Sequence, residues 1–196
     1  MLFRSNSPAV KYIILYFIYA VFLGSMGYFV PREEFFWMLM SYGICWAAYY
    51  FIVKRSFAFS SGFLLAAGLR IVLLFSLPWL SDDFYRFFFD GQLLAHGVNP
   101  YIHLPVDALD LLDTLPSAIR DQLLDGMNSP LYFSVYTPLN QLFFWVSVMS
   151  NDRIFCNILI LRLIIVAFDL LSIFLVYKIT SIFEQATKYI WLYAFN

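Results

Sequence analysis

Four charged side chains between residues 82 and 90 are the ones best suited to chemistry: Asp82, Asp83, Arg86 and Asp90. On a helix, Asp82 and Asp90 each lie four residues from Arg86, a spacing that brings side chains together on one face. Asp83 lies three residues before Arg86, on the same face. One interpretation is a capped helix with ordinary ion pairs, each worth about 0.2–0.5 kcal/mol. The other is a carboxylate general base beside a cation that could hold a phosphate, and the spacing does not decide between them.

A second set of charges lies inside apolar segments: Arg70, Arg162 and Asp169. A charge near the centre of a bilayer costs at least about 2.5–3.5 kcal/mol, so such a residue normally faces protein or a wet cavity. Arg162 and Asp169 share one helix face but are about 10 Å apart along the axis, too far to pair directly. We therefore expect a salt bridge between Arg70 and Asp169, which could fix the register of two helices or line a polar pathway.

The composition predicts a membrane protein. Of the 196 residues, 62% are apolar and 21% aromatic, only 13% are charged, and the mean hydropathy is +0.76. A soluble domain has roughly 45–50% apolar and about 25% charged residues. These values exclude a single soluble domain, a disordered chain, a nucleic-acid binder and a disulfide-stapled secreted module. The two cysteines and two histidines are too scattered to form a zinc site.

Apolar segments long enough for a hydrocarbon core of about 30 Å, which needs about 20 helical residues, predict the architecture. We expect an all-α, polytopic bundle of five membrane-spanning helices, with the start of a sixth. The five spans are Val10–Val30, Phe35–Val53, Phe57–Leu80, Leu131–Met149 and Ile154–Tyr177, and the sixth begins within Tyr189–Asn196.

The lysines and arginines that flank these spans predict the orientation, because cytoplasmic flanks are enriched in them. If the spans alternate, five basic residues fall on the side of the N-terminus: Arg4, Lys11, Lys54, Arg55 and Arg153. Three fall on the other side: Arg32, Lys178 and Lys188. We therefore expect a retained first helix, an N-terminus in the cytoplasm, and an outward-facing interval at residues 81–129.

The interval 81–129 follows the third span and reads as a small helical cap. Ser81 can cap a helix whose aromatic residues suit the membrane interface, and Gly97 is a natural stop after it. Two shorter helices are expected at Asp107–Leu115 and Ser117–Met127, the second with an apolar stripe. The interval is acidic, with eight aspartates: Asp82, Asp83, Asp90, Asp107, Asp110, Asp113, Asp121 and Asp125.

The same interval carries a motif that resembles one in a known group of enzymes. The matching residues are Ser81–Arg86, then Asp90 and Gly91, then Gly97–Tyr101. They resemble the first outer-loop motif of GT-C-type integral-membrane glycosyltransferases, and among these most nearly the bacterial mannosyltransferase-like group. Weaker similarities to the same group are Asn128–Gln141 and, in the fifth span, Leu161–Leu163 with Asp169–Leu171.

This resemblance implies an inverting transfer of a sugar from a polyprenyl-phosphate carrier to a glycan or lipid acceptor on the outer face. Asp83 is then the expected general base, with Asp82 as the alternative or as a partner that orients the acceptor. Arg86 is expected to bind the donor phosphate and to stabilise its growing negative charge. The residues expected to shape the pocket are Tyr85, Asp90, Asn99 and Tyr101.

The resemblance also implies a location in the bacterial inner membrane, with the interval 81–129 in the periplasm or outside the cell. The expected partners are the lipid-linked sugar, its acceptor and membrane lipids, with no nucleic acid. No metal-ligand spacing is present, and a divalent cation beside Asp82 and Asp83 stays open as the one cofactor to consider. Because members of this group are longer, residues 1–196 are expected to be a single N-terminal part that is inactive alone.

Two other functions stay open from the sequence. The first is a transporter or channel that uses Arg70, Arg162 and Asp169 as a polar pathway, although the Gly- or Pro-broken helices of repeated halves are missing from the sequence. The second is a non-catalytic membrane partner.

Overall fold

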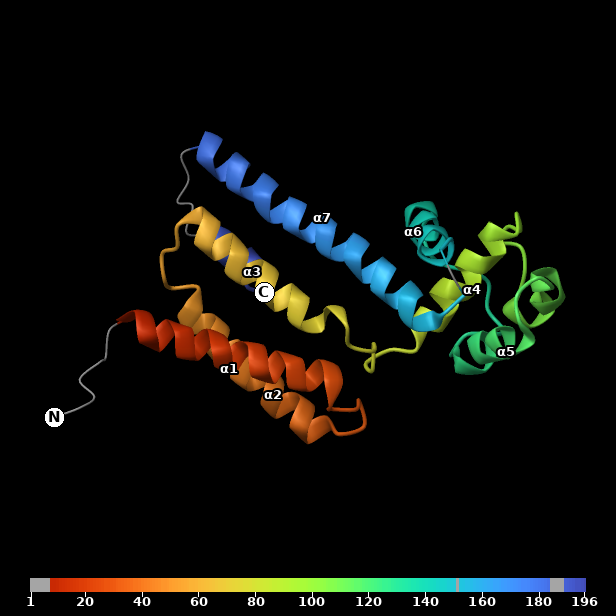
Figure 1. The fold of residues 1–196 in the computed structure, drawn as a ribbon, viewed down its shortest axis with the longest axis horizontal. Helices are drawn as coiled ribbons and strands as arrows, with labels where there is room; N and C mark the ends of the chain where they lie inside the picture. Colours follow the sequence, from red (N-terminus) through yellow and green to blue (C-terminus); the bar gives the residue numbers. More distant parts are fainter. Residues whose placement is uncertain (1–7, 151, 184–188) are drawn as a thin grey trace. The chain divides into compact units, whose positions relative to one another are not determined.

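The computed structural model describes residues 8–150, 152–183 and 189–196 (Figure 1). Every regular element in these residues is a helix, and no strand occurs among them, so the predicted all-α class is confirmed. The chain divides into two compact units. Unit 1 comprises Met1–Trp79 with Val166–Asn196, and unit 2 comprises Leu80–Ile165.

Unit 1 is built from apolar helices: α1 (Pro8–Tyr28), α2 (Phe35–Ile52), α3 (Phe59–Leu74), the part of α7 (Ile154–Ile182) from Val166 onward, and α8 (Ile190–Ala194). Helices α1 and α2 form a hairpin and lie side by side (Figure 1). Because these helices are apolar all round, they expose large side chains such as Phe17 and Trp46, as helices in lipid do. The buried centre of unit 1 includes Ala66, Ile173 and Trp191.

Three helices are long and apolar enough to cross a membrane: Val10–Tyr28 within α1, all of α2, and α7. Helix α3 is apolar but has 16 residues, or about 24 Å, so it is shorter than the predicted span Phe57–Leu80. The expected start of a sixth span is the five-residue helix α8. The described residues therefore support three spans, and the predicted five are not confirmed.

The predicted span Leu131–Met149 differs most from the structure. Its helix, α6 (Pro138–Val148), has 11 residues and a length of about 16 Å, too short for a bilayer. Helix α6 begins late because Thr137 caps it, accepting a hydrogen bond from the backbone N–H of Asn140 at 3.5 Å. Pro138 then takes the first helical position, where its missing N–H costs nothing. Residues 127–136, between α5 and Thr137, have no regular secondary structure.

Unit 2 contains α4 (Asp83–Ala95), the 3-10 turns η1 (Pro105–Asp107) and η2 (Leu109–Leu112), α5 (Ser117–Gly126), α6, and α7 up to Ile165. Helix α4 runs through its core, and Phe88, Phe89 and Leu93 are buried there. The prediction of an interfacial helix is therefore not supported, because these aromatic and apolar side chains pack against protein. The predicted stop is confirmed: Gly97 ends the segment with a φ of 74°.

The remaining predictions for the outer interval are met in part. Two short 3-10 turns replace the helix expected at Asp107–Leu115, whereas α5 matches the helix expected at Ser117–Met127. The apolar stripe of α5 faces the core of unit 2, where Leu123 is buried and Ile119 is half-buried. Unit 2 extends well beyond residue 129, because α6 and the start of α7 complete its core.

Candidate active site

A buried ion pair inside α4 forms the centre of the site. Arg86 Nε lies 2.7 Å from Asp90 Oδ1, and the two side chains are only 2% and 0% exposed. The i,i+4 spacing predicted that these residues would meet, but not that they would be buried. Away from water such a pair needs every remaining donor and acceptor to be satisfied, so the partners around it determine what it can do.

Asp90 is held by two further donors. Its second carboxylate oxygen, Oδ2, accepts hydrogen bonds from Ser134 Oγ at 2.6 Å and from Gln141 Nε2 at 2.8 Å. Gln141 Nε2 also lies 2.7 Å from Ser134 Oγ. The carboxylate of Asp90 therefore joins α4 to α6 and to the irregular segment before α6. The Asp90 side chain is fully buried, so it acts as an anchor within this network.

Arg86 ties the same segment to α4 through backbone carbonyl groups. Its Nη1 donates to the carbonyl oxygens of Ser129 at 3.1 Å and Tyr132 at 2.8 Å. Two polar atoms of this buried network have no hydrogen-bond partner among the described residues, Arg86 Nη2 and Gln141 Oε1. A buried donor without a partner is costly, and Nη2 is thus a guanidinium N–H group with unused capacity to bind an anion.

Asp83 stands at the first residue of α4, where an acidic side chain is favoured by the helix dipole. It is half-buried, its backbone N–H donates to Ser81 Oγ at 3.2 Å, and its Oδ1 accepts from Asn128 Nδ2 at 3.1 Å. Asp82 precedes it and is half-buried as well. Asp83 is therefore a partly accessible carboxylate held in place from two sides, and it lies one helical turn before Arg86.

Tyr136 closes this group from the segment before α6. Its ring packs edge-on against Phe87 and Phe144, with centroid distances of 5.0 and 5.3 Å. Burial raises the pKa of the Tyr136 phenol; the negative charge of Asp83 raises it further, Arg86 opposes this and Asp90 adds to it. The Tyr136 phenol therefore lies within the electrostatic influence of Asp83, Arg86 and Asp90.

The other residues expected in the pocket lie around the same segment. Tyr101 is at the surface and donates from its hydroxyl to the carbonyl oxygen of Tyr136 at 2.6 Å. Asn99 is exposed, and its Oδ1 accepts from the backbone N–H of Tyr101 at 3.0 Å, which shapes the turn. Tyr85 is half-buried, and its ring faces Gly126, where a Cβ atom would lie only 2.7 Å from the ring.

The three charged residues of the apolar helices lie in different units: Arg70 and Asp169 in unit 1, and Arg162 in unit 2. The predicted pair is present in unit 1, where Arg70 Nε lies 2.6 Å from Asp169 Oδ2. Asp169 Oδ1 also accepts from the Tyr193 hydroxyl at 2.7 Å, and Arg70 Nη1 donates to the carbonyl oxygens of Ala66 and Ala194. Arg162 belongs to unit 2 and is half-buried.

The sequence reasoning did not assign a role to several residues that complete the cluster. These residues all lie in the segment between α5 and the first turns of α6: Asn128, Ser129, Tyr132, Ser134, Tyr136 and Gln141. Gln141 carried a usable signal, because a lone amide inside an apolar segment needs a buried partner. The carbonyl groups that bind Arg86 carried none, since any residue type supplies them.

Comparison with known protein families identifies the family of this chain. Residues 36–196 match the model of the MptA_B family, described as alpha-(1->6)-mannopyranosyltransferase, N-terminal domain. No curated protein and no solved structure matched the chain. The matched residues include the whole of unit 2 and the charged cluster of α4. Since the match covers most of the chain, the protein belongs to the alpha-(1->6)-mannopyranosyltransferase family and contains its N-terminal domain.

Proposed function

We propose that this chain is the N-terminal part of a GT-C-type glycosyltransferase that moves a mannose-type sugar from a polyprenyl-phosphate donor to a glycan or lipid acceptor. Family membership supports mannosyltransferase activity, with a sugar donor and a glycan acceptor in general terms. Three parts of the proposal are more specific than family membership: the lipid-linked donor, the inversion of configuration and the outer-face location. They are supported by the motif of residues 81–101 and by the cluster around α4.

The observation that best supports this proposal is the position of Asp83. Its carboxylate is accessible in part, and it is fixed by Asn128 and by the start of α4. A general base must combine access to the substrate with a fixed direction, and Asp83 has both. In this proposal Asp83 takes the proton from the acceptor hydroxyl while that oxygen attacks the anomeric carbon. The phosphate leaves from the opposite face, which inverts the anomeric configuration.

Asp82 is the second carboxylate of the proposed mechanism. It lies beside Asp83 at the N-terminal end of α4 and would orient the acceptor or act as the alternative base. If a divalent cation takes part, these two carboxylates are the oxygen ligands that it would use.

Arg86 is the proposed ligand of the donor phosphate. Its Nη2 has no partner among the described residues, so one guanidinium N–H group is available to a phosphate oxygen. Because the side chain is only 2% exposed, the donor reaches Nη2 only after the segment that begins at Ser129 moves. Tyr101, Asn99 and Tyr85 border this segment and are the proposed walls of the pocket. In the proposed topology this site faces the outer side of the bacterial inner membrane.

The test compares Asp83→Asn with Asp121→Asn in the full-length protein. Asp121 is an exposed carboxylate on α5 of the same unit, so its loss controls for a change of charge. Membranes that contain each variant receive radiolabelled polyprenyl-phosphate mannose and a mannoside acceptor, and the labelled product is counted. We expect Asp83→Asn to reduce transfer by about 10²-fold or more, because a positioned base contributes about 10²–10⁴-fold. Asp121→Asn should retain it.

Two controls make the result decisive. The yield and detergent-solubilised size profile of Asp83→Asn must match those of the unmodified protein. Asp82→Asn should reduce transfer less than Asp83→Asn does. Normal transfer by folded Asp83→Asn would refute the assignment of the base, and activity with a nucleotide-linked mannose alone would refute the lipid-linked donor.

A further inference from the structure

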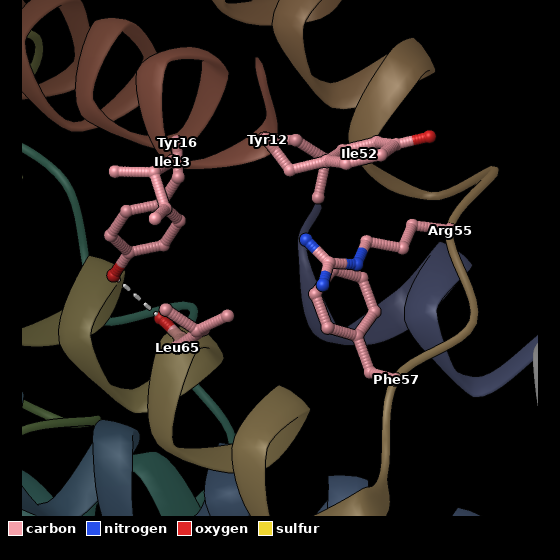
Figure 2. A pocket seen from close by; sticks show the side chains of 7 residues that line it. All are labelled: Tyr12, Ile13, Tyr16, Ile52, Arg55, Phe57 and Leu65. Carbon is pink, nitrogen blue, oxygen red and sulfur yellow. Dashed lines mark hydrogen bonds between the residues drawn. The ribbon is translucent and has the colours of Figure 1, made fainter. Parts of the chain in front are cut away.

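A pocket in unit 1 lies away in sequence from every residue of the proposed catalytic cluster. It has a volume of about 160 Å³. Its walls come from α1, from the end of α2, from the link to α3 and from α3 itself (Figure 2). Seven residues line it: Tyr12, Ile13, Tyr16, Ile52, Arg55, Phe57 and Leu65. The lining is mostly apolar and aromatic, and Arg55 is its one charged residue.

Arg55 is held so that its charge faces this pocket. Its guanidinium carbon lies 4.8 Å from the centroid of the Tyr12 ring and 5.3 Å from that of Phe57. Figure 2 shows the guanidinium extending from the α2–α3 link to the space above the Phe57 ring. Within the described chain no carboxylate forms a salt bridge with Arg55. Its hydrogen-bonding nitrogens are therefore available to an anion in the pocket.

The walls of the pocket are fixed by their own contacts. The Tyr16 hydroxyl donates to the carbonyl oxygen of Leu65 at 2.8 Å, which joins α1 to α3 (Figure 2). The ring of Phe57 packs on Trp191 and Phe195, with centroid distances of 5.5 and 5.4 Å. A pocket that is already formed before binding does not lose affinity to the ordering of its walls.

Charge is distributed unequally along the α1–α2 hairpin. Lys11 at the start of α1 and Lys54 after the end of α2 accompany Arg55, resting on the rings of Phe51 at 5.7 Å and Tyr50 at 3.8 Å. The glutamates of the hairpin, Glu33 and Glu34, lie at its turn, which is the opposite end. Among the described residues of the hairpin, the pocket end thus carries three cations and no carboxylate.

The depth of the pocket follows from the length of the helices. Helices α1 and α2 each cross a membrane if inserted, so the ends where Lys11 and Arg55 lie reach the headgroup level. Basic side chains at this level attract anionic lipids. Aromatic rings beneath them suit the same boundary between headgroups and acyl chains.

We propose that this pocket binds one anionic phospholipid, with its phosphate on Arg55 and its apolar part against Ile13, Ile52 and Leu65. An inorganic phosphate would meet the guanidinium but would leave the apolar walls uncovered, and a neutral lipid would leave the three cations unmatched. The site belongs to unit 1, whereas Asp83 belongs to unit 2, so lipid binding is a property separate from sugar transfer.

The test measures lipid retention by native mass spectrometry of the full-length protein in detergent, with phosphatidylglycerol and phosphatidylcholine as probes. We expect Arg55→Gln to lower affinity for phosphatidylglycerol about tenfold or more, because the charge-assisted hydrogen bonds between the guanidinium and the phosphate are lost. Lys178→Gln is the matched control, because Lys178 also lies over an aromatic ring, that of Phe174, but outside the pocket. It should bind the lipid as the unmodified protein does.

A second variant separates pocket binding from simple surface attraction. Leu65→Phe keeps every charge but places a larger side chain in the pocket, and it should also weaken binding of phosphatidylglycerol. If Leu65→Phe does not fold, Ile13→Phe serves the same purpose at a position that is 67% exposed. Unchanged retention in Arg55→Gln, or in the folded variant with the filled pocket, would overturn the proposal. Equal retention of phosphatidylcholine, or full displacement by millimolar inorganic phosphate, would overturn it too.

Discussion

Arg86 Nε lies 2.7 Å from Asp90 Oδ1 one helical turn away, and the pair is sealed inside unit 2. The pair is a structural crosslink, because its remaining atoms bind Ser134, Gln141 and two carbonyl groups of the segment before α6. This crosslink holds the segment that carries Asn128, and Asn128 in turn directs Asp83. The ion pair therefore helps to position the carboxylate of Asp83, the proposed general base.

The crosslink predicts a large effect on stability. Replacing Asp90 with Asn or Ala leaves the Arg86 guanidinium buried without its counter-charge, and breaking a buried pair in this way costs about 3–5 kcal/mol. We expect the thermal unfolding midpoint in detergent to fall clearly in either variant, as measured by scanning fluorimetry. Asp113→Asn, which alters an exposed carboxylate of the same unit, should leave the midpoint unchanged. An unaltered midpoint in Asp90→Ala would contradict the structural role.

The close approach of α4 and α6 predicts an effect at a single glycine. A Cβ atom on Gly91 would lie 2.5 Å from the carbonyl oxygen of Phe144, which belongs to the backbone and cannot swing away. We expect Gly91→Ala to destabilise the protein by roughly 1–3 kcal/mol, the usual cost of overpacking. Gly43→Ala is the matched control, because a Cβ atom there meets nothing within 4 Å. It should be neutral or slightly stabilising, since alanine is the better helix former.

Tyr136 predicts a pH dependence of stability at the alkaline end. Its pKa is raised above the ordinary tyrosine value of 10.0, first by burial and then by Asp83, so the folded state holds the phenol proton more tightly than the unfolded state. That contribution is fully present below pH 10 and is lost as the pH rises through the raised pKa. Tyr136→Phe keeps the ring against Phe87 and Phe144 but has no proton to lose.

The measurement is the unfolding midpoint of both proteins from neutral pH upward. The difference between the unmodified protein and Tyr136→Phe should be constant up to about pH 10 and should then shift against the unmodified protein. Asp83→Asn should bring the tyrosine titration to lower pH, because it removes the second cause of the raised pKa. Parallel stability curves over the whole range would show that the phenol has no such shift.

Much of the fold could be predicted from local patterns in the sequence. Long apolar runs predicted the helices α1, α2 and α7, and Gly97 predicted the end of α4. The fourth span is not confirmed, because its apolar residues do not form one continuous helix: Thr137 and Pro138 start a helix inside it. Helix α6 has 11 residues and buries the amide of Gln141 against the core of unit 2.

The candidate site was predictable only in its local part. The spacing of Asp83, Arg86 and Asp90 follows from the helix period and needs no tertiary information. The burial of Arg86 depends on carbonyl groups more than 40 positions away, and backbone carbonyls leave no trace in a sequence. Which carboxylate stays accessible could thus be decided only in three dimensions, where Asp90 is enclosed and Asp83 is not.

The pair of Arg70 and Asp169 yields the last prediction. Its oxygen–nitrogen distance is 2.6 Å, and the side chains are 13% and 27% exposed. Removal of one partner by Arg70→Leu or Asp169→Leu should cost about 3–5 kcal/mol, since it strands a charge among apolar helices. The double variant should cost less than the sum of the two by about 0.5–3 kcal/mol, as coupled neighbours do. Unfolding in mixed micelles measures all three variants, and strictly additive losses would show that the pair does not act as one unit.

The same Arg70→Leu protein tests the transport alternative. If the pair is structural, sugar transfer should fall in proportion to the amount of folded protein. Normal transfer with a lost substrate flux would instead support a polar pathway through these helices.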